Sequence, residues 1–181
     1  MLSFAHGLQQ TPAMKRPRRP AAMAAVLLAL AALGLSVVMG DGGAPPASGG
    51  ETEKFPRAEL LIATAAGAAL RFDVEVARTS AQRAQGLMFR TALAPDAGML
   101  FIYDPPREMA MWMRNTILSL DMLFIAADGR ITRIVANTTP MSEATIESRG
   151  PVGAVLELVA GSAKRLGIRS GDRIDLTPFA P

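Results

Sequence analysis

The residue types best suited to chemistry gather in one short stretch, EMAMWMRNT, which spans residues 108–116. It contains the only tryptophan of the chain, Trp112, and ends in a polar Arg-Asn-Thr series. If the stretch is a strand, Trp112 and Arg114 share one face, because side chains alternate along a strand. A partly exposed tryptophan beside an arginine and Asn115 can hold a planar or sugar-like ligand by stacking and hydrogen bonds. A tryptophan packed in the core is the alternative.

The other face of the same stretch carries three methionines, Met109, Met111 and Met113. Thioethers suit Cu(I), and they also fill irregular gaps in protein cores. The chain has no cysteine, and its single histidine, His6, lies far upstream. Because neither can complete a metal site here, core packing is the favoured interpretation of the methionines. We expect no bound metal and no cofactor.

Two carboxylates interrupt apolar runs, Asp121 in ILSLDMLFIA and Glu157 in AVLELVAG. A buried carboxylate needs an arginine or several N–H groups as partners. The arginines that could pair with Asp121 are Arg83, Arg90 and Arg114. An internal ion pair is therefore the favoured interpretation. The alternative is a general acid with a raised pKa, and the two carboxylates could then form the pair of a carboxylate-dependent hydrolase.

Composition excludes several classes of protein. The lack of cysteine, and of any histidine beyond His6, rules out Cys/His zinc sites, Cys-His and Ser-His-Asp nucleophiles and covalent haem attachment. Four of the 19 Lys and Arg precede residue 40 but none of the 16 Asp and Glu, so the remainder carries 15 minus 16, or −1. This balance provides no basic patch, and we expect no nucleic-acid partner.

The start of the chain has the layout of an export signal. Four basic residues within residues 15–19 precede an apolar run without charge, residues 21–39, and then a small residue, Gly40. A cleaved signal peptide is favoured, and an uncleaved membrane anchor is the alternative. We expect a periplasmic or secreted protein that meets the membrane only through the apolar run, if that run is retained. Met14 is an alternative start to Met1.

The chain divides into three parts by composition. Residues 1–40 form the predicted signal or anchor. Residues 41–54, DGGAPPASGGETEK, contain almost nothing to bury and are predicted to be a flexible linker. Residues 55–181 form a single globular domain that must be held together by its core alone, since no disulfide is possible.

Hydrophobic patterning in this domain predicts mostly short strands. The expected strands span residues 58–64, 69–77, 99–103, 109–113, 117–126, 130–136, 154–159 and 173–176. Two hairpins are indicated by the turn pairs Ala66-Gly67 and Asp128-Gly129. Thr79 and Gln82 have capping-box spacing and predict a short helix that ends in a left-handed Gly86. A second short helix or turn is expected over residues 162–168, and residues 140–151 are predicted to be a loop.

These elements indicate a mainly β fold with short α elements (α+β). We expect a compact, partly open β-barrel or sandwich with one or two short helices that cover its openings. We expect it to be monomeric.

Five motifs stand in order along the domain: R-x-x-G-L-M-x-R from residue 83, G-M-L-F from 98, W-M-x-N-T from 112 with L-D after it, L-E-L-x-A-G from 156 and G-I-x-x-G-D from 167. Together they resemble domain-of-unknown-function family 192. The resemblance covers residues 60–176. It implies a small β-rich fold, often exported, with no established activity.

The sequence favours a binding or accessory module of the cell envelope over an enzyme. A saccharide or another small polar ligand is the expected partner. The candidate ligand-binding residues, from the motifs and from the EMAMWMRNT stretch, are Arg83, Arg90, Trp112, Arg114, Asn115, Thr116, Asp121 and Glu157.

Overall fold

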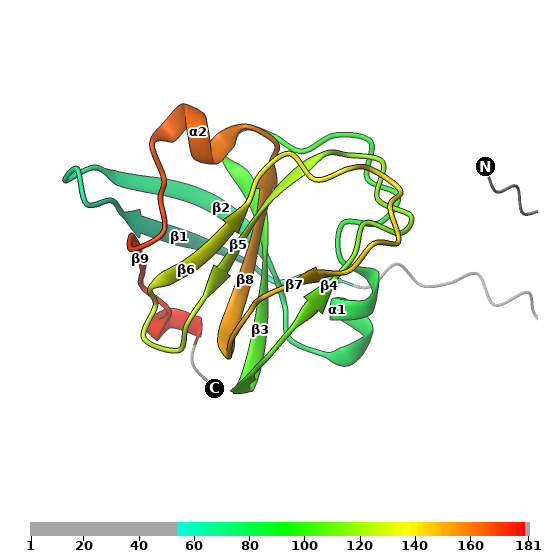
Figure 1. Ribbon diagram of the computed structural model, residues 1–181, viewed down its shortest axis with the longest axis horizontal. Helices are drawn as coiled ribbons and strands as arrows, with labels where there is room; N and C mark the ends of the chain where they lie inside the picture. The colour runs from blue at the N-terminus through cyan, green and yellow to red at the C-terminus, as the bar shows by residue number, and fades with distance from the viewer. Residues whose placement is uncertain (1–53, 180–181) are drawn as a thin grey trace, which may run out of the picture. The chain divides into compact units, whose positions relative to one another are not determined.

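The computed structural model describes residues 54–179 (Figure 1). The predicted signal or anchor, and the linker up to residue 53, lie outside the described residues. Within the described part, no helix is long and apolar enough to cross a membrane.

The domain is built around one seven-stranded sheet with the strand order β6-β5-β8-β3-β2-β1-β9 (Figure 1). All neighbours are antiparallel except β2 and β3, which are joined through α1. A separate two-stranded ribbon pairs β4 with β7. The strands are β1 Arg57–Ala63, β2 Ala69–Ala77, β3 Ala97–Arg107, β4 Ala110–Met111, β5 Leu120–Ile125, β6 Ile131–Val135, β7 Ile146–Glu147, β8 Val152–Val159 and β9 Arg173–Ile174. The helices are α1 Ser80–Gln85, α2 Ser162–Leu166 and the 3-10 helix Thr177–Phe179.

The local predictions agree closely with these elements. Both hairpins form, and the alternation of β2 places its apolar side chains on one face. Thr79 and Gln82 form the complete capping box of α1. Gly86 follows with φ 50° and ψ −139°, so it has a positive φ but not the predicted left-handed helical conformation. The strand over residues 109–113 is shorter than predicted, because only Ala110 and Met111 pair with β7.

The sheet curls until its two outer strands nearly meet. An isolated bridge joins Arg130, before β6, to Arg173 of β9. The N–H of Ile131 donates to the carbonyl of Asp172 at 2.8 Å, and the N–H of Ile174 donates to the carbonyl of Gly129, also at 2.8 Å. The result is a nearly closed, barrel-like sheet, which confirms the predicted α+β, partly open barrel.

Gly129 is the residue at which this closure depends on the absence of a side chain. Its φ is 82°, and a Cβ atom there would lie 2.2 Å from the carbonyl oxygen of Ile174. We therefore expect Gly129→Ala to lower the free energy of unfolding by about 2–3 kcal/mol. Gly67→Ala is the control, since Gly67 has a similar φ of 85° but a Cβ atom there would meet no other atom within 4 Å. Urea denaturation measures both, and equal losses would contradict a steric role.

The central strands are buried on both faces. Inside the barrel lies one hydrophobic core, to which β5 and β8 contribute Leu123 and Leu156. On the outer face lies a second core, which includes Met122 and Phe124 of β5 and Val155 of β8. Every residue of β5 is buried as a result. If only one face of the sheet were buried here, buried and exposed residues would alternate along β5, as they do along much of β2.

The two helices have different positions relative to the barrel. Ala163 of α2, with Ile168 after it, packs into the barrel core, so α2 covers one opening as predicted. The end of α1 instead contacts the outer core, where a Cβ on Gly86 would lie 3.1 Å from the Phe101 ring. The prediction that both helices cover openings was therefore wrong for α1, which the capping pattern could not place in space.

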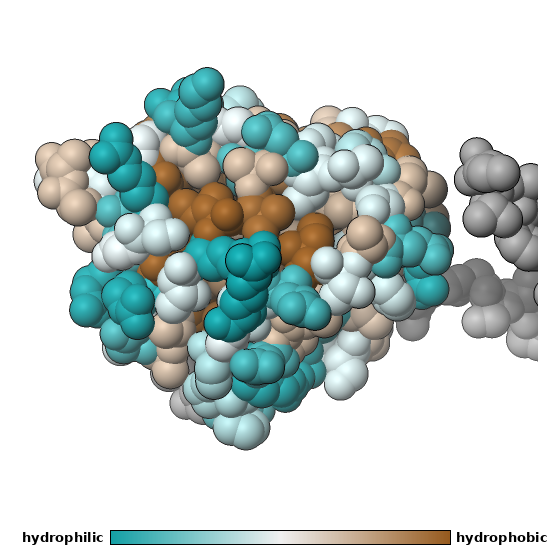
Figure 2. Space-filling view, in the orientation of Figure 1, coloured by the Kyte–Doolittle hydropathy of each residue, from teal (hydrophilic) through white to brown (hydrophobic). Residues whose placement is uncertain are grey.

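The outer core is not completely covered. Figure 2 shows apolar surface gathered on the face seen in Figure 1, with hydrophilic side chains lying across it. The half-buried side chains packed on this core include Leu118, Val135 and Ile146. The outer face of the sheet therefore has apolar side chains that are only partly buried and can contact another molecule.

Candidate functional site

A cavity of about 250 Å³ lies on the outer face of the sheet, among α1, β3 and β4. We call it the Glu157 pocket, after the buried carboxylic acid that lines it. It is lined by Arg83, Ala84, Gln85, Gly86, Met88, Tyr103, Arg107, Met109, Ala110, Met111, Trp112, Thr116 and Glu157. Four of the eight predicted site residues line it: Arg83, Trp112, Thr116 and Glu157.

Glu157 comes from the middle of β8, the strand with β3 and β5 on its two sides. In the register it lies opposite Met99 and Met122, both members of the outer core. It is only 4 % exposed, and burial raises the pKa of its carboxyl to about 8. Among residues 54–179, no hydrogen bond or ion pair involves this carboxyl group.

The carboxyl oxygens of Glu157 nevertheless reach the cavity. In the described part of the chain, every buried side-chain oxygen or nitrogen either has a hydrogen-bond partner or keeps some accessible surface. Because Glu157 has no partner, its oxygens must have that access, and they meet the space of the pocket. A carboxyl group in this position is free to bond to a ligand.

Two arginines flank Tyr103 above Glu157. The guanidinium carbons of Arg83 and Arg107 lie 5.5 and 5.3 Å from the centre of the Tyr103 ring, a cation–π geometry. Arg83 is held in place, since it donates to the carbonyl of Ile102 at 3.1 Å. Arg107 is exposed. The pocket is therefore lined by two positively charged groups, of which Arg107 is exposed, and by one buried carboxyl group.

Tyr103 is the one aromatic residue fully inside this arrangement. Its hydroxyl donates to the sulfur of Met111 at 3.5 Å. Burial raises the pKa of Tyr103 to about 12, with a smaller contribution from nearby Glu157, while Arg83 and Arg107 act in the opposite direction. Tyr103 thus remains a neutral wall of the pocket at physiological pH.

The EMAMWMRNT stretch divides between core and pocket. Met113 is fully buried in the outer core, and Met109 and Met111 are half-buried against it while they line the pocket. Trp112 also lines the pocket and is 48 % exposed, and the guanidinium carbon of Arg114 lies 4.3 Å from its ring centre. Because Arg114 covers one face of the indole, that face is not free to stack on a sugar ring.

Asn115 and Thr116 turn the chain beside the pocket. Asn115 has φ 58°, and its carbonyl accepts from the N–H of Phe89 at 2.9 Å. Its side-chain amide reaches the sulfur of Met88 at 3.9 Å. Thr116 is buried and donates to the carbonyl of Arg114 at 3.4 Å. These contacts hold the pocket wall, and Asn115 does not line the cavity itself.

Within the described residues Asp121 has no arginine partner, contrary to the favoured prediction. One carboxylate oxygen accepts from the N–H groups of Asn137 at 2.9 Å and Gly161 at 3.1 Å, and the other accepts from Ala163 at 2.9 Å. These donors lie after β6 and at the start of α2, so Asp121 joins three segments at one end of the barrel. Its role here is structural.

Asp121 and Glu157 do not form a pair. Met122, the neighbour of Asp121, is the residue directly opposite Glu157, while Asp121 lies opposite Leu158 of the barrel core. The two carboxylates therefore project from opposite faces of one sheet. This geometry contradicts the hypothesis of a hydrolase that uses both on one substrate.

Arg90 also lies outside the Glu157 pocket. It makes an ion pair with Glu75 of β2, which also accepts from Arg57 at 3.4 Å. It contributes to a surface network beside the N-terminal strands.

Sequence reasoning missed Tyr103, Arg107 and Met88 as pocket residues. For Tyr103 a signal existed, because it lies two and four residues after Phe101 and Met99 and so shares their face of a strand. No local signal marked Arg107 or Met88. Their side chains reach the pocket only because β3 extends past its proline pair and because α1 lies against the outer core.

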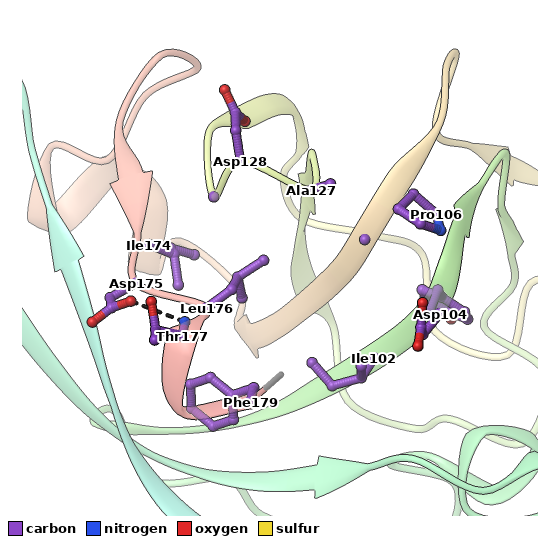
Figure 3. Close-up of a pocket in the computed structure, with 13 residues that line it drawn as sticks. Ile102, Asp104, Pro106, Ala127, Asp128, Ile174, Asp175, Leu176, Thr177 and Phe179 are labelled. Atoms are coloured by element: carbon purple, nitrogen blue, oxygen red, sulfur yellow. Dashed lines mark hydrogen bonds between the residues drawn. The ribbon is translucent and has the colours of Figure 1, made fainter. Parts of the chain in front are cut away.

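A larger cavity of about 410 Å³ opens at the far end of the barrel, between β3, the β5–β6 turn and the C-terminal segment (Figure 3). Ile102, Ile174 and Phe179 supply apolar walls, and three aspartates stand around it. Asp128 lies 3.9 Å from each of two arginines, and Asp175 accepts from the N–H of Thr177 at 2.9 Å. Residues 54–179 contain no His, Cys, Asp and Glu cluster suited to a metal.

The chain matches known proteins over most of this domain. The model of the family described as "Uncharacterized ACR, COG1430" (DUF192) matches residues 61–176. A crystal structure from Sinorhizobium meliloti 1021, of a protein provisionally named a transcription regulator, is 49% identical, covers 68% of this chain and 96% of its own, and has a TM-score of 0.67. None of the curated proteins compared with the chain matches it.

A second solved structure is a protein of unknown function from Novosphingobium aromaticivorans DSM 12444. It is 40% identical, covers 72% of this chain and 89% of its own, and has a TM-score of 0.65. The matched residues include every strand of the sheet except the first residues of β1, together with the Glu157 pocket. The chain therefore belongs to the DUF192 family.

Proposed function

We propose that this domain binds a small amphiphilic anion in the Glu157 pocket. The observation that carries the proposal is the Glu157 carboxyl group, which is buried, has no hydrogen-bond or ion-pair partner within residues 54–179, and opens on a cavity. A buried polar group costs up to about 1–3 kcal/mol where neither protein nor water bonds to it, and less where it opens on a cavity, as Glu157 does. A ligand that forms this bond recovers part of that cost, which favours the bound state.

The charge of the pocket favours an anion. Arg83 and Arg107, which line it, carry two positive charges. The raised pKa of Glu157 keeps its carboxyl group mostly protonated at neutral pH, so it adds little negative charge. A ligand carboxylate or phosphate is attracted by both guanidiniums, whereas an ammonium group is repelled by them.

The walls favour an apolar body on that anion. Met88, Met109 and Met111 present thioether side chains, which adapt to irregular apolar shapes. Protonated Glu157 donates a hydrogen bond, so it suits an oxygen atom at the far end of the ligand. The pocket thus fits a short chain or ring with an anionic group at one end and a hydroxyl or carbonyl at the other.

Catalysis receives less support than binding. Glu157 can carry a proton, but the other carboxylate of the hydrolase hypothesis projects from the opposite face of the sheet. The remaining titratable groups that line the pocket are Tyr103 and the two arginines. Arginine does not deprotonate in proteins, and a tyrosine with a pKa near 12 is a poor base at neutral pH.

The proposal includes a location outside the cytoplasm. It is supported by the basic flank and the uncharged apolar run of residues 21–39, which have the layout of a signal or anchor. In the envelope, the domain acts as a binding or accessory module. The Sinorhizobium protein has the provisional name of a transcription regulator, but we do not propose that role here. Residues 41–181 carry a formal charge of 15 minus 16, or −1, which provides no basic patch for nucleic acid.

The test is a titration followed by the emission of Trp112, which lines the pocket and is the only tryptophan. The probes are 8-hydroxyoctanoate, octanoate, octylammonium and N-acetylglucosamine. We expect saturable binding of 8-hydroxyoctanoate, weaker binding of octanoate by about 5–10-fold for the lost hydrogen bond, and no binding of octylammonium. Arg107→Ala should weaken binding of both anions by about tenfold.

Two variants complete the test. Arg130→Ala, an exposed arginine outside the pocket, should leave affinity unchanged. Glu157→Leu should remove the preference for 8-hydroxyoctanoate over octanoate. Binding of N-acetylglucosamine without binding of either anion would support a saccharide ligand and overturn the proposal.

A further inference from the structure

Four large apolar side chains are exposed on three neighbouring loops. Phe89 is 71 % exposed, Met141 55 %, Ile117 49 % and Trp112 48 %. We call these four residues the apolar loop cluster. Only one other large apolar residue in the described part of the chain is exposed, Leu61, at 38 %. Exposed apolar side chains are common singly, but a group of them marks an interaction surface.

Backbone hydrogen bonds hold the three loops together. The N–H of Phe89 donates to the carbonyl of Asn115 at 2.9 Å, and the N–H of Met141 donates to the carbonyl of Thr116 at 3.0 Å. The loops follow α1, β4 and β6, and they lie side by side in Figure 1. The four exposed side chains are therefore carried by loops that come from distant parts of the sequence and are bonded to one another.

Stability does not explain the residues at two of these positions. Phe89 has φ 63° and Met141 has φ 59°. A positive φ costs a residue with a Cβ atom about 1–2 kcal/mol, and asparagine tolerates it better than phenylalanine or methionine does. Both side chains are mostly exposed, so packing returns little of that cost. Strained residues of this kind often belong to functional sites.

We propose that the apolar loop cluster docks the domain on the surface of a lipid bilayer. Its side chains are of the types that enter the boundary between headgroups and acyl chains, namely two aromatic and two aliphatic residues. Arg114, packed on the ring of Trp112, can contact lipid phosphates beside the inserted indole. A side chain as exposed as Phe89 protrudes, which suits a deformable bilayer better than a rigid protein surface.

The chain before the domain supports this choice of partner. Residues 21–39 are apolar and uncharged, and residues 41–54 connect them to the domain. Fourteen extended residues span about 48 Å, more than the width of a domain of this size. The connection ends at Lys54, whose carbonyl accepts from Gln82 of α1 at 2.8 Å. Since α1 leads directly to Phe89, the point of attachment and the cluster belong to the same region of the domain.

This inference does not depend on the proposed ligand. The cluster and the Glu157 pocket share only Trp112. A domain docked in this way would hold the pocket next to the bilayer.

The test uses the full chain, reconstituted in vesicles of phosphatidylcholine and phosphatidylglycerol at a four-to-one ratio. Brominated acyl chains quench a nearby indole, and Trp112 is the only tryptophan. We expect about a twofold loss of emission when the lipids are brominated next to the headgroup. Two degrees of quenching are compared: that of Trp112 by brominated lipids, and that of Trp112 in lipid-free protein by soluble bromide. If the first is no greater than the second, the proposal is overturned.

A double variant separates docking from simple tethering. Phe89→Asn with Met141→Asn removes apolar surface while it places a residue suited to positive φ at both sites, so the fold should survive. We expect it to lose most of the quenching. Leu61→Asn, an exposed apolar residue of β1 outside the cluster, should keep it. If the double variant were quenched like the parent, or if it only converted a dimer to a monomer, a bilayer-docking role would be excluded.

Discussion

Asp121→Ala is expected to lower the free energy of unfolding by about 3–5 kcal/mol, the largest effect of a single side-chain truncation that we predict. Asp121 is fully buried, and its two oxygens accept three backbone N–H groups, those of Asn137, Gly161 and Ala163. Without the carboxylate, three backbone N–H donors lose their acceptor, and the N–H of Ala163 is buried. Each costs about 1–3 kcal/mol, with some relief from local rearrangement.

Urea denaturation of the variant and the parent measures this loss. Glu59→Ala is the control, because Glu59 is an exposed carboxylate whose one partner, Arg71, is also exposed. We expect the control to change stability by less than about 0.5 kcal/mol. A loss below about 1 kcal/mol for Asp121→Ala would show that Asp121 is not what joins the three segments.

The second large effect is a dependence of stability on pH through Glu157. The pKa of Glu157 is about 8 in the folded protein, against 4.5 for the free side chain. Between these values the folded state holds a proton that the unfolded state has lost. The contribution of Glu157 to the free energy of unfolding is therefore fully present below pH 4.5, and it is lost as the pH rises through the folded pKa. The loss across this window is roughly 3–5 kcal/mol.

Glu157→Gln isolates this contribution. Glutamine has nearly the same shape and no proton to lose, so the variant should lack the decline between pH 5 and pH 8.5. The comparison requires urea unfolding of both proteins at both pH values. Other carboxylates contribute equally to the two proteins and cancel in the difference. Parallel stability curves would mean that Glu157 is ionised in the folded protein, which its burial opposes.

The proposed role of Glu157 in binding conflicts with the stability of the domain. A leucine or methionine at this position would remove the cost of a buried carboxyl group among Met99, Met122 and the other residues of the outer core. The retained acid makes sense if a ligand bonds to it. The same reasoning applies to Phe89 and Met141, where asparagine would be less strained.

Much of the fold could be predicted from the sequence because its signals are local. The alternation in ALRFDVEVA, the capping box from Thr79 to Gln82 and the Asp128-Gly129 turn each depend on residues a few positions apart. Such patterns determine which face of a strand is apolar and where a helix begins. They also indicated that Met113 is core while Trp112 points outward.

The candidate site depended on information that local patterns do not contain. In the sequence Asp121 and Glu157 look alike, because each is the one acidic residue within an apolar strand. Their difference arises from strand register, which places Met122 opposite Glu157 and so sends the two carboxylates to opposite faces. Asp121 meets backbone N–H groups at one barrel end, whereas Glu157 meets a cavity.

The sequence by itself determined most of the strands, the first helix, the turns and the membership of the family, but it missed β7, which lies in the predicted loop 140–151. Only the tertiary structure decided that α1 lies on the outer face, that Arg107 and Tyr103 stand above Glu157, and that Phe89 lies beside Trp112 and Met141. The physical reason is distance along the chain. Helices, strands and turns are determined by residues that are neighbours in the sequence. A pocket is formed by segments that are far apart in the sequence, and their register and position are fixed only when the two hydrophobic cores pack.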